Sequence, residues 1–295
     1  MSKIVVIGCG NVGMAYSYSL LNQILGIEKL VLIDIDQSKL LGKVLDLNHS
    51  IFNLNSNTSV YIGDYSDCQD ADIVCITAGP SQDHLKSSRM EDLLEANKIF
   101  RNIIPSIKES GFSGIYLIAS NPLDVMSYVT WKYSSCNPYK VIGSGTLLDT
   151  ARLRYILSQK YSKPINEVTG YVLGEHGDSQ FIPWSSVNLS KIPESEAVSI
   201  SEQVKKAGFE VCKFQGFTCY GIASALTRIT RAILYDENST LPVCSYLDKY
   251  GIFISTPSVI GKNGIIRTNT FDLEKSDIEK LENSVSIIKT AIGHL

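Results

Sequence analysis

Short apolar runs alternate with helical stretches along the first half of the chain. The runs are continuous and rich in β-branched residues, which is typical of strands buried on both faces of a parallel sheet. They lie at residues 4–7, 30–33, 59–62, 72–76, 115–118 and 141–143. Helices are expected between them, the clearest at residues 14–25 and 90–109. The pattern predicts an α/β fold with a doubly wound parallel sheet of the Rossmann type.

The second half mixes helical and strand patterns. We expect a helix that opens within residues 143–152 and ends near 160, a helix at 220–234, and strands at 168–173, 241–246 and 251–254. A capping-box sequence at 276–279 is expected to start a C-terminal helix, which docks through one apolar stripe: Ile278, Leu281, Val285, Ile288 and Ile292.

Two domains are therefore expected. Residues 1–143 would form the Rossmann domain and residues 144–295 a mixed α+β domain. The helix at about 219–235 is amphipathic and able to pack back on the first domain.

Composition excludes several function classes. A net charge of −3 and a pI near 5.9 leave no basic surface for nucleic acid or anionic membrane. Seven scattered cysteines without Cys-x-x-Cys spacing favour free thiols in a reducing cytosol over disulfides or a metal site. No apolar stretch approaches membrane-spanning length, and the first residues do not read as a signal peptide. We expect a cytoplasmic protein without a metal.

The first apolar run ends in a glycine-rich turn, Gly8-Cys9-Gly10-Asn11-Val12-Gly13, and the second ends in Asp34. Gly8 permits the tight turn, Gly10 lets the backbone approach a pyrophosphate, and Gly13 lets the following helix pack closely. The alternative is a turn that binds nothing. The complete strand–turn–helix–strand–Asp order favours a dinucleotide site.

Asp34 bears on the choice of dinucleotide. Its carboxylate would accept hydrogen bonds from the adenosine ribose hydroxyls and would repel a 2′-phosphate. No arginine follows within residues 35–38 to offset that repulsion. The sequence therefore predicts NAD rather than NADP.

Further candidates follow the later strands. Thr77-Ala78-Gly79 and Asn121 stand at the carboxyl ends of their strands, where ligands bind in open α/β sheets. A polar loop at 80–88 then leads to Arg89 and reads either as an active-site lid or as a solvated connection.

The second half adds one histidine and one charged pair. His176 lies between two glycines and suits reversible proton transfer, unless it is merely a loop histidine bonded to its neighbours. Asp149 and Arg152 share a helix face because they are three residues apart. They form either an intrahelical ion pair or a site in which Asp149 meets a histidine and Arg152 an anionic substrate.

Six motifs in order now match a family. The chain resembles the L-2-hydroxy acid dehydrogenases of the lactate/malate dehydrogenase superfamily over essentially its full length, in its L-lactate or L-2-hydroxyisocaproate branch. The resemblance is carried by GCGNVG, ITAG, SNPLDV, VIGSGTLLDTARLR, LGEHGDS and GFTCYGIA.

The resemblance implies a role for each candidate. His176 would be the general acid/base, Asp149 its orienting partner, and Arg152 the substrate carboxylate clamp. Other roles follow from matched positions: a lid arginine that polarises the carbonyl (Arg89) and substrate contacts (Asn121, Gln82, Thr218). NAD would lie on Gly8, Gly10, Asn11, Val12, Gly13, Asp34, Thr77, Ala78, Gly79 and Asn121.

The polar loop at 80–88 indicates whether the substrate carries one carboxylate or two. It contains no second arginine for a second carboxylate, and Asp83 would repel a dicarboxylate. Gln82 stands where lactate dehydrogenases carry a glutamine, although this loop has one extra residue before Arg89. The resemblance thus implies a small 2-oxo or 2-hydroxy monocarboxylate and a homodimer or homotetramer. Alternatives are a malate dehydrogenase and a catalytically silent NAD-binding protein of the same fold.

Overall fold

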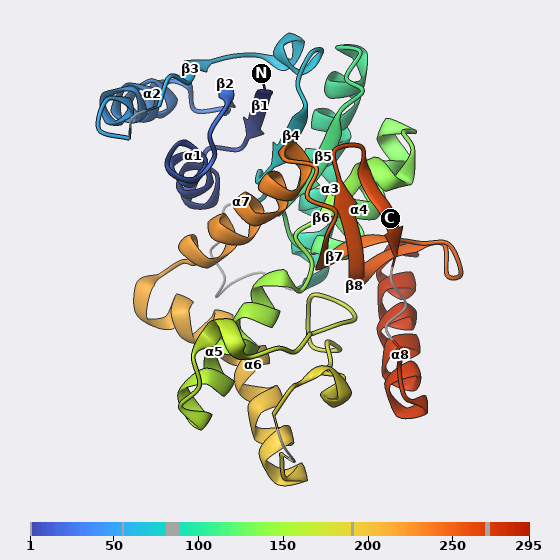
Figure 1. Cartoon of the computed structure of the whole chain (residues 1–295). Coiled ribbons are helices and arrows are strands. Elements are labelled where there is room, and N and C mark those ends of the chain that lie inside the picture. Colours follow the sequence, from blue (N-terminus) through green and yellow to red (C-terminus); the bar gives the residue numbers. More distant parts are fainter. Residues whose placement is uncertain (1, 55, 81–88, 190–191, 269–271) are drawn as a thin grey trace.

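The computed structural model describes residues 2–54, 56–80, 89–189, 192–268 and 272–295, without the side chain of Arg89. One nine-stranded sheet runs through the molecule in the order β3-β2-β1-β4-β5-β6-β7-β8-β9 (Figure 1). The six strands of its parallel part are β1 (Ser2–Ile7), β2 (Ile27–Ile33), β3 (Ser59–Ile62), β4 (Ile73–Ile76), β5 (Ile115–Ile118) and β6 (Val141–Gly143).

Alternate residues of these strands face two separate cores. Ile4 and Leu30 contact α1 (Asn11–Gln23), α2 (Gln37–Ile51) and α7 (Tyr220–Leu234). Val5 and Val31 contact α3 (Arg89–Glu109) and α4 (Leu123–Ser134) on the other face. Every position of β4, β5 and β6 is therefore buried, as is β1 beyond Ser2, which explains why the sequence shows continuous apolar runs there rather than alternation.

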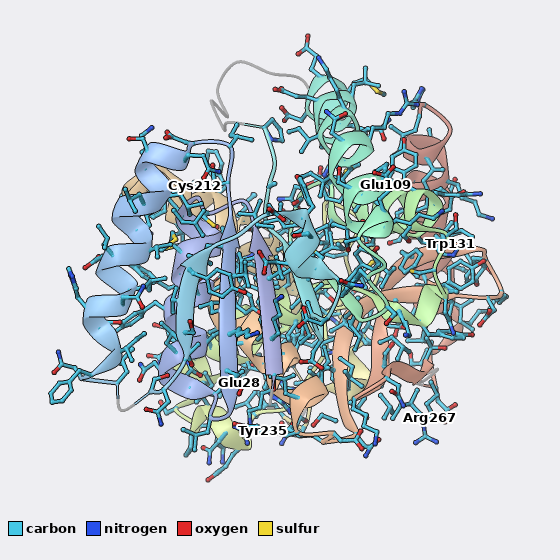
Figure 2. The ribbon with its side chains drawn as sticks, turned by 90° about the horizontal axis from the view of Figure 1, so that it is seen from above. Glu28, Glu109, Trp131, Cys212, Tyr235 and Arg267 are labelled. Atoms are coloured by element: carbon cyan, nitrogen blue, oxygen red, sulfur yellow. The ribbon has the colours of Figure 1, made fainter. Side chains whose placement is uncertain are left out.

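The sheet does not end with the first domain. Gly143 of β6 pairs with Cys244 of the antiparallel strand β7 (Ser239–Leu247), and β8 (Ile252–Gly261) and β9 (Gly264–Thr268) follow. The strands expected at 241–246 and 251–254 exist, but they extend the first sheet instead of forming a separate one. Trp131 of α4, labelled in Figure 2, covers this part through ring contacts with Tyr246 and Phe253.

Helices α5 (Leu147–Tyr161), α6 (Glu194–Gln215) and α8 (Lys275–Ile292) surround the end of the sheet where the parallel strands finish. Short 3₁₀ turns lie elsewhere in the chain at Tyr65–Cys68, Pro138–Lys140, Ile165–Glu167 and Trp184–Ser186. Helix α7 packs on α1, where the Tyr16 hydroxyl lies 2.6 Å from that of Thr230.

Two local predictions are wrong. Residues 168–173 form no strand: only single bridges link Leu173 to Phe181 and Gly174 to Ser255. Helix α8 begins at Lys275 without a side-chain cap, so Ser276 lies inside the helix and Ile278 is 40% exposed. At residues 168–173 packing decided the conformation: Val168 and Val172 are buried against α5 and α6 rather than in a sheet.

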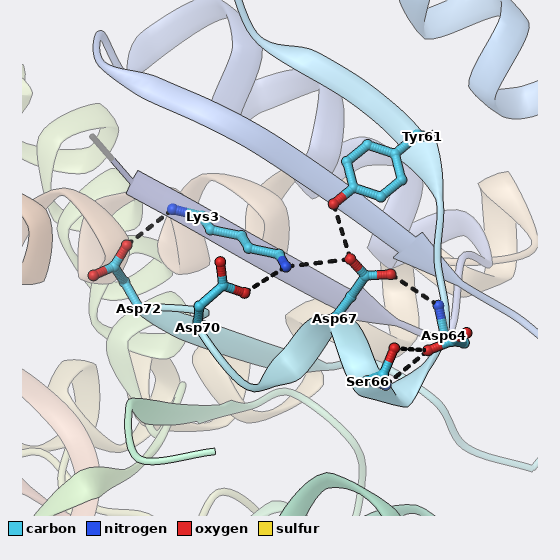
Figure 3. Close-up of polar contacts among 7 residues, drawn as sticks. All are labelled: Lys3, Tyr61, Asp64, Ser66, Asp67, Asp70 and Asp72. Carbon is cyan, nitrogen blue, oxygen red and sulfur yellow. Dashed lines mark hydrogen bonds and ion pairs between the residues drawn. The ribbon is translucent and has the colours of Figure 1, made fainter. Parts of the chain in front are cut away.

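A network of charges lies at the amino end of β1 (Figure 3). The ammonium group of Lys3, whose side chain is 9% exposed, lies 2.6 Å from Asp70 and 3.2 Å from Asp67. Tyr61 donates a further hydrogen bond to Asp67 at 2.9 Å. This network is remote from the carboxyl ends of the strands, which carry the candidate site.

Candidate active site

The glycine-rich turn has the close approaches that glycine permits. Gly8 has φ of +93°, and a Cβ there would lie 2.4 Å from the backbone nitrogen of Ala78. A Cβ on Gly13 would lie 2.2 Å from the carbonyl oxygen of Gly8. Side chains are therefore excluded at both positions by the protein itself.

Gly10 differs from both. A Cβ at this position would meet no atom within 4 Å, so the protein leaves open space over the turn. Gly10 is also the N-cap residue of α1, which begins at Asn11 rather than at residue 14 as expected. The free amides and the dipole of a helix N-terminus favour an anionic group. This cradle fits the pyrophosphate of a dinucleotide.

Asp34 is already held by the turn. Its Oδ2 accepts a hydrogen bond from Cys9 N–H at 2.6 Å, and Oδ1 accepts one from Asp36 N–H at 3.0 Å. Each carboxylate oxygen keeps further acceptor capacity for ribose hydroxyls. Two lysines of α2 also lie here: Lys39 pairs with Asp36 at 3.0 Å, and Lys43 donates to the carbonyl of Cys9. Both lysines lie beyond residues 35–38, the stretch in which the sequence was searched for a cation.

The loops after β4 and β5 meet at the same edge. Ile76 and Ile118 are register partners, and the Ser120 hydroxyl donates hydrogen bonds to the carbonyls of Ile76 and Ala78. Asn121 follows directly and is exposed. Thr77, whose hydroxyl donates to the carbonyl of Gly8, completes the contact with the glycine-rich turn.

Asp149 holds two charged partners at once. Its Oδ2 lies 2.7 Å from Nδ1 of His176, and its Oδ1 accepts a hydrogen bond from the Arg152 guanidinium at 2.9 Å. The Asp149 side chain is 3% exposed, whereas Arg152 is 18% and His176 27% exposed. The intrahelical pair and the contact with a histidine, weighed as alternatives in the sequence, both exist.

The pKa values of this cluster follow from burial and charge. Burial raises the pKa of Asp149, but His176 and Arg152 outweigh it and hold the pKa below its ordinary value. Burial lowers the pKa of His176, but the Asp149 carboxylate outweighs it and raises the pKa above the ordinary value. An imidazole so placed exchanges a proton readily while its partner remains ionised.

The turn at 174–179 is braced from several sides. Gly174, with φ of +94°, exchanges two backbone hydrogen bonds with Ser255 of β8, each 3.1 Å long. Ser284 of α8 donates to the carbonyl of Ser179 at 2.9 Å. Helix α8, which showed no sign of chemistry in the sequence, thus fixes the turn that carries His176.

Three further candidates are Thr218, Arg89 and Gln82. Thr218 lies half-buried in the connection between α6 and α7 and forms no hydrogen bond to the His176–Asp149–Arg152 cluster in the described part of the chain. Arg89 is the first residue of α3, but its side chain is not described. Gln82 lies outside the described residues.

Sequence reasoning missed two residues of the site. Asp124, in the first turn of α4, accepts a hydrogen bond from the backbone N–H of His176 at 2.8 Å. Gly208 of α6 faces Arg152, and a Cβ there would lie 3.3 Å from the guanidinium. The only signals were a carboxylate within the apolar run 123–126 and a glycine within a helix, and neither points to a partner distant in sequence.

Comparisons with known proteins agree with this geometry. Residues 2–143 match the lactate/malate dehydrogenase NAD binding domain, and residues 146–294 match the lactate/malate dehydrogenase alpha/beta C-terminal domain. The chain belongs to the lactate/malate dehydrogenase family. It is an NAD-dependent oxidoreductase with the doubly wound sheet that the sequence predicted.

Several relatives share its full length. The chain is 40% identical to the L-lactate dehydrogenase of Bacillus pumilus, over 99% of this chain and 98% of that protein. It is 39% identical to the L-lactate dehydrogenase of Borrelia turicatae, over 100% and 98%. A minor L-lactate dehydrogenase from Enterococcus mundtii superposes with a TM-score of 0.95 at 34% identity, over 100% of this chain and 98% of that one. Among the described residues, no helix is long and apolar enough to cross a membrane.

Proposed function

We propose that this enzyme interconverts a small L-2-hydroxy monocarboxylic acid and its 2-oxo acid, with L-lactate and pyruvate or a larger pair such as that of 2-oxoisocaproate as substrates. The contact of His176 and Arg152 with one buried carboxylate, Asp149, carries the proposal. In this proposal, a proton-transfer group and a carboxylate-binding group share one buried carboxylate partner. The relatives named L-lactate dehydrogenase support the monocarboxylate.

His176 would act as the acid/base group through Nε2. Asp149 accepts the proton on Nδ1, so the neutral ring keeps Nε2 free to take the hydroxyl proton of the substrate. The ionised Asp149 then stabilises the imidazolium that forms. Bound NAD supplies the hydride acceptor.

Arg152 would bind the substrate carboxylate. One of its N–H groups is hydrogen-bonded to Asp149, which orients the guanidinium and leaves four donors for other groups. Two parallel N–H groups fix a carboxylate in one plane. Since the same carboxylate of Asp149 orients Arg152 and His176, substrate position and proton transfer are coupled.

The remaining assignments complete the proposal. Arg89 and Gln82 would act from the loop over the site, and Asn121 and Thr218 would line it. NAD would contact the ten positions given above from Gly8 to Asn121. The division into domains at residue 143, a homodimer or homotetramer, and a cytoplasmic location belong to the same proposal. The free state of all seven cysteines supports that location.

NADH consumption tests the substrate. Pyruvate, 2-oxoisocaproate, phenylpyruvate and oxaloacetate would be compared by kcat/KM under identical conditions. We expect turnover of at least one monocarboxylate and little of oxaloacetate. A kcat/KM that favours oxaloacetate would replace the proposal with malate dehydrogenase.

A histidine variant tests the mechanism and the silent alternative together. His176→Asn should reduce kcat by at least about a thousandfold, since it removes the titrating group. NADH binding should stay intact. His294→Asn, at an exposed C-terminal position, is the matched control and should retain full activity. Full activity of His176→Asn would overturn the assigned mechanism.

A further inference from the structure

A second buried carboxylate contacts the turn that carries His176. Asp124 is 3% exposed, and its Oδ2 accepts the backbone N–H of His176 at 2.8 Å. The thiol of Cys244, on β7, lies beside the carboxylate. Oδ1 has no hydrogen-bond partner among the described residues. Asp124 thus joins the turn to the helix that follows Asn121.

The hydrogen bond to the N–H of His176 does not by itself explain why a carboxylate, rather than a neutral acceptor, lies at position 124. A neutral amide oxygen would accept the same N–H at a much smaller desolvation cost. Burial raises the pKa of Asp124 to about 6, while the Cys244 thiol and the N–H of His176 act in the opposite direction. Burial thus opposes the charge of the carboxylate, one of whose oxygens is unpaired among the described residues. The cationic form of His176 is the charge that stabilises it.

We propose that Asp124 is a positioning residue for His176: it fixes the backbone of the turn at 174–179, and its negative charge favours the protonated imidazole. This inference rests on the proposed role of His176 as the acid/base group. Asp149 holds the ring directly at Nδ1, whereas Asp124 acts from the backbone. The two carboxylates come from α5 and α4, the helices on either side of β6 in the chain.

Other ionisable groups face this pair. Burial and the Arg152 guanidinium lower the pKa of His176, whereas Asp149 and Asp124 raise it. Glu175, in the same turn, raises the pKa of Asp124 by like charge. Cys244 stays a neutral thiol donor because burial raises its pKa well above the ordinary value. Loss of the Asp124 charge is therefore expected to lower the pKa of His176.

Asp124→Asn tests the charge separately from the hydrogen bond, because the amide oxygen still accepts the N–H of His176. The pKa of His176 would be measured in the full-length protein by NMR of the ring Cε1–H, assigned by its loss in His176→Asn. The pH profile of 2-oxo acid reduction would be measured in parallel. We expect a lower pKa of His176. Reduction needs the protonated imidazole, so its activity should fall at a lower pH than in the parent enzyme.

Two further variants complete the test. Asp178→Asn removes the same charge from an exposed position of the same turn and should leave the pKa and the pH profile unchanged. Asp124→Ala removes the acceptor as well and should reduce kcat about a hundredfold, as expected for a displaced acid/base group. Thermal melting and NADH binding would establish that each variant is folded.

The outcomes distinguish this inference from the proposed function. A pKa of His176 that is the same in Asp124→Asn and in the parent enzyme would overturn the role of the charge. Full activity of Asp124→Ala would overturn the role in positioning. Both results leave the proposed function standing, which is overturned by different observations: an active His176→Asn variant or a kcat/KM that favours oxaloacetate.

Discussion

Nδ1 of His176 lies 2.7 Å from Oδ2 of Asp149, a carboxylate whose side chain is 3% exposed. The two residues are 27 positions apart in the chain and come from a helix and from a turn. Since an ionised Asp149 stabilises the protonated imidazole, the pair couples the proton affinity of His176 to the packing of α5.

Replacing Asp149 should affect activity through this coupling. Asp149→Asn is expected to reduce kcat about a hundredfold or more, because the ring loses its fixed tautomer and the imidazolium its counter-charge. The pKa of His176 should fall, so the midpoint for 2-oxo acid reduction moves to lower pH. The measurement is kcat across the pH range in both directions. An unchanged midpoint would contradict this reading.

The same pair should make stability depend on pH. The pKa of Asp149 is lowered, so its contribution is present above the unfolded value of about 4 and is lost as pH falls through the folded pKa. The pKa of His176 is raised, so its contribution is present below about 6.5 and is lost as pH rises through the folded pKa. The Tm difference between parent and Asp149→Asn should therefore be largest between about pH 4 and 6.5.

Two glycines of the same turn should respond differently. Gly10→Val adds a side chain to open space, so Tm should stay unchanged while the Kd for NADH rises about tenfold or more. Gly8→Ala meets the backbone of Ala78 and a positive φ, so it should destabilise the fold by about 2 kcal/mol or more. Unfolding and NADH titration measure both effects. Equal NADH affinity of Gly10→Val and parent would argue against the cradle.

A substitution at Gly208 is expected to raise the stability of the fold and to weaken substrate binding. Gly208→Ala should stabilise α6 by up to about 1 kcal/mol, since alanine favours a helix. Its methyl group would press on the Arg152 guanidinium at 3.3 Å, so KM should rise about three- to tenfold. Gly42→Ala is the control, because its Cβ meets nothing within 4 Å in α2. The assignment of Arg152 fails if both variants keep the parent KM.

Lys3 should matter for stability and not for catalysis (Figure 3). Lys3→Met leaves the partly buried Asp67 without its ammonium partner and should cost about 1–3 kcal/mol. Lys39→Met breaks an exposed pair with Asp36, whose charges are screened by water, and should cost much less than Lys3→Met. Denaturant unfolding measures the difference. The kcat of Lys3→Met should be unchanged, because the network lies at the amino end of β1.

Local patterns predicted the parallel sheet well. Strands β3, β5 and β6 have the expected bounds. At β5 and β6, an apolar run buried on both faces leaves little choice of conformation. The segment at 168–173 reads equally well as a strand, yet Val168 and Val172 are buried against α5 and α6 without a ladder. An apolar pattern predicts that a segment is buried. Which elements bury it depends on residues elsewhere in the chain.

The candidate site shows the same division. Asp149 and Arg152 were recognisable as neighbours because a helix brings residues three apart to one face. Asp124 was not recognisable, because its partner is the backbone N–H of His176, 52 positions away. The role of Gly208 likewise could not be recognised in the sequence, because it follows from the position of Gly208 beside Arg152 in the fold.

The sequence by itself determined the parallel sheet, the glycine-rich turn, and the residues able to exchange a proton or bind a carboxylate. These depend on local conformation and on the chemistry of single side chains. Only the tertiary structure decided that one buried carboxylate orients both His176 and Arg152, that Asp124 holds the same turn from the backbone, and that α8 braces it. Such contacts depend on how distant segments pack, and packing distances are not encoded in any local pattern.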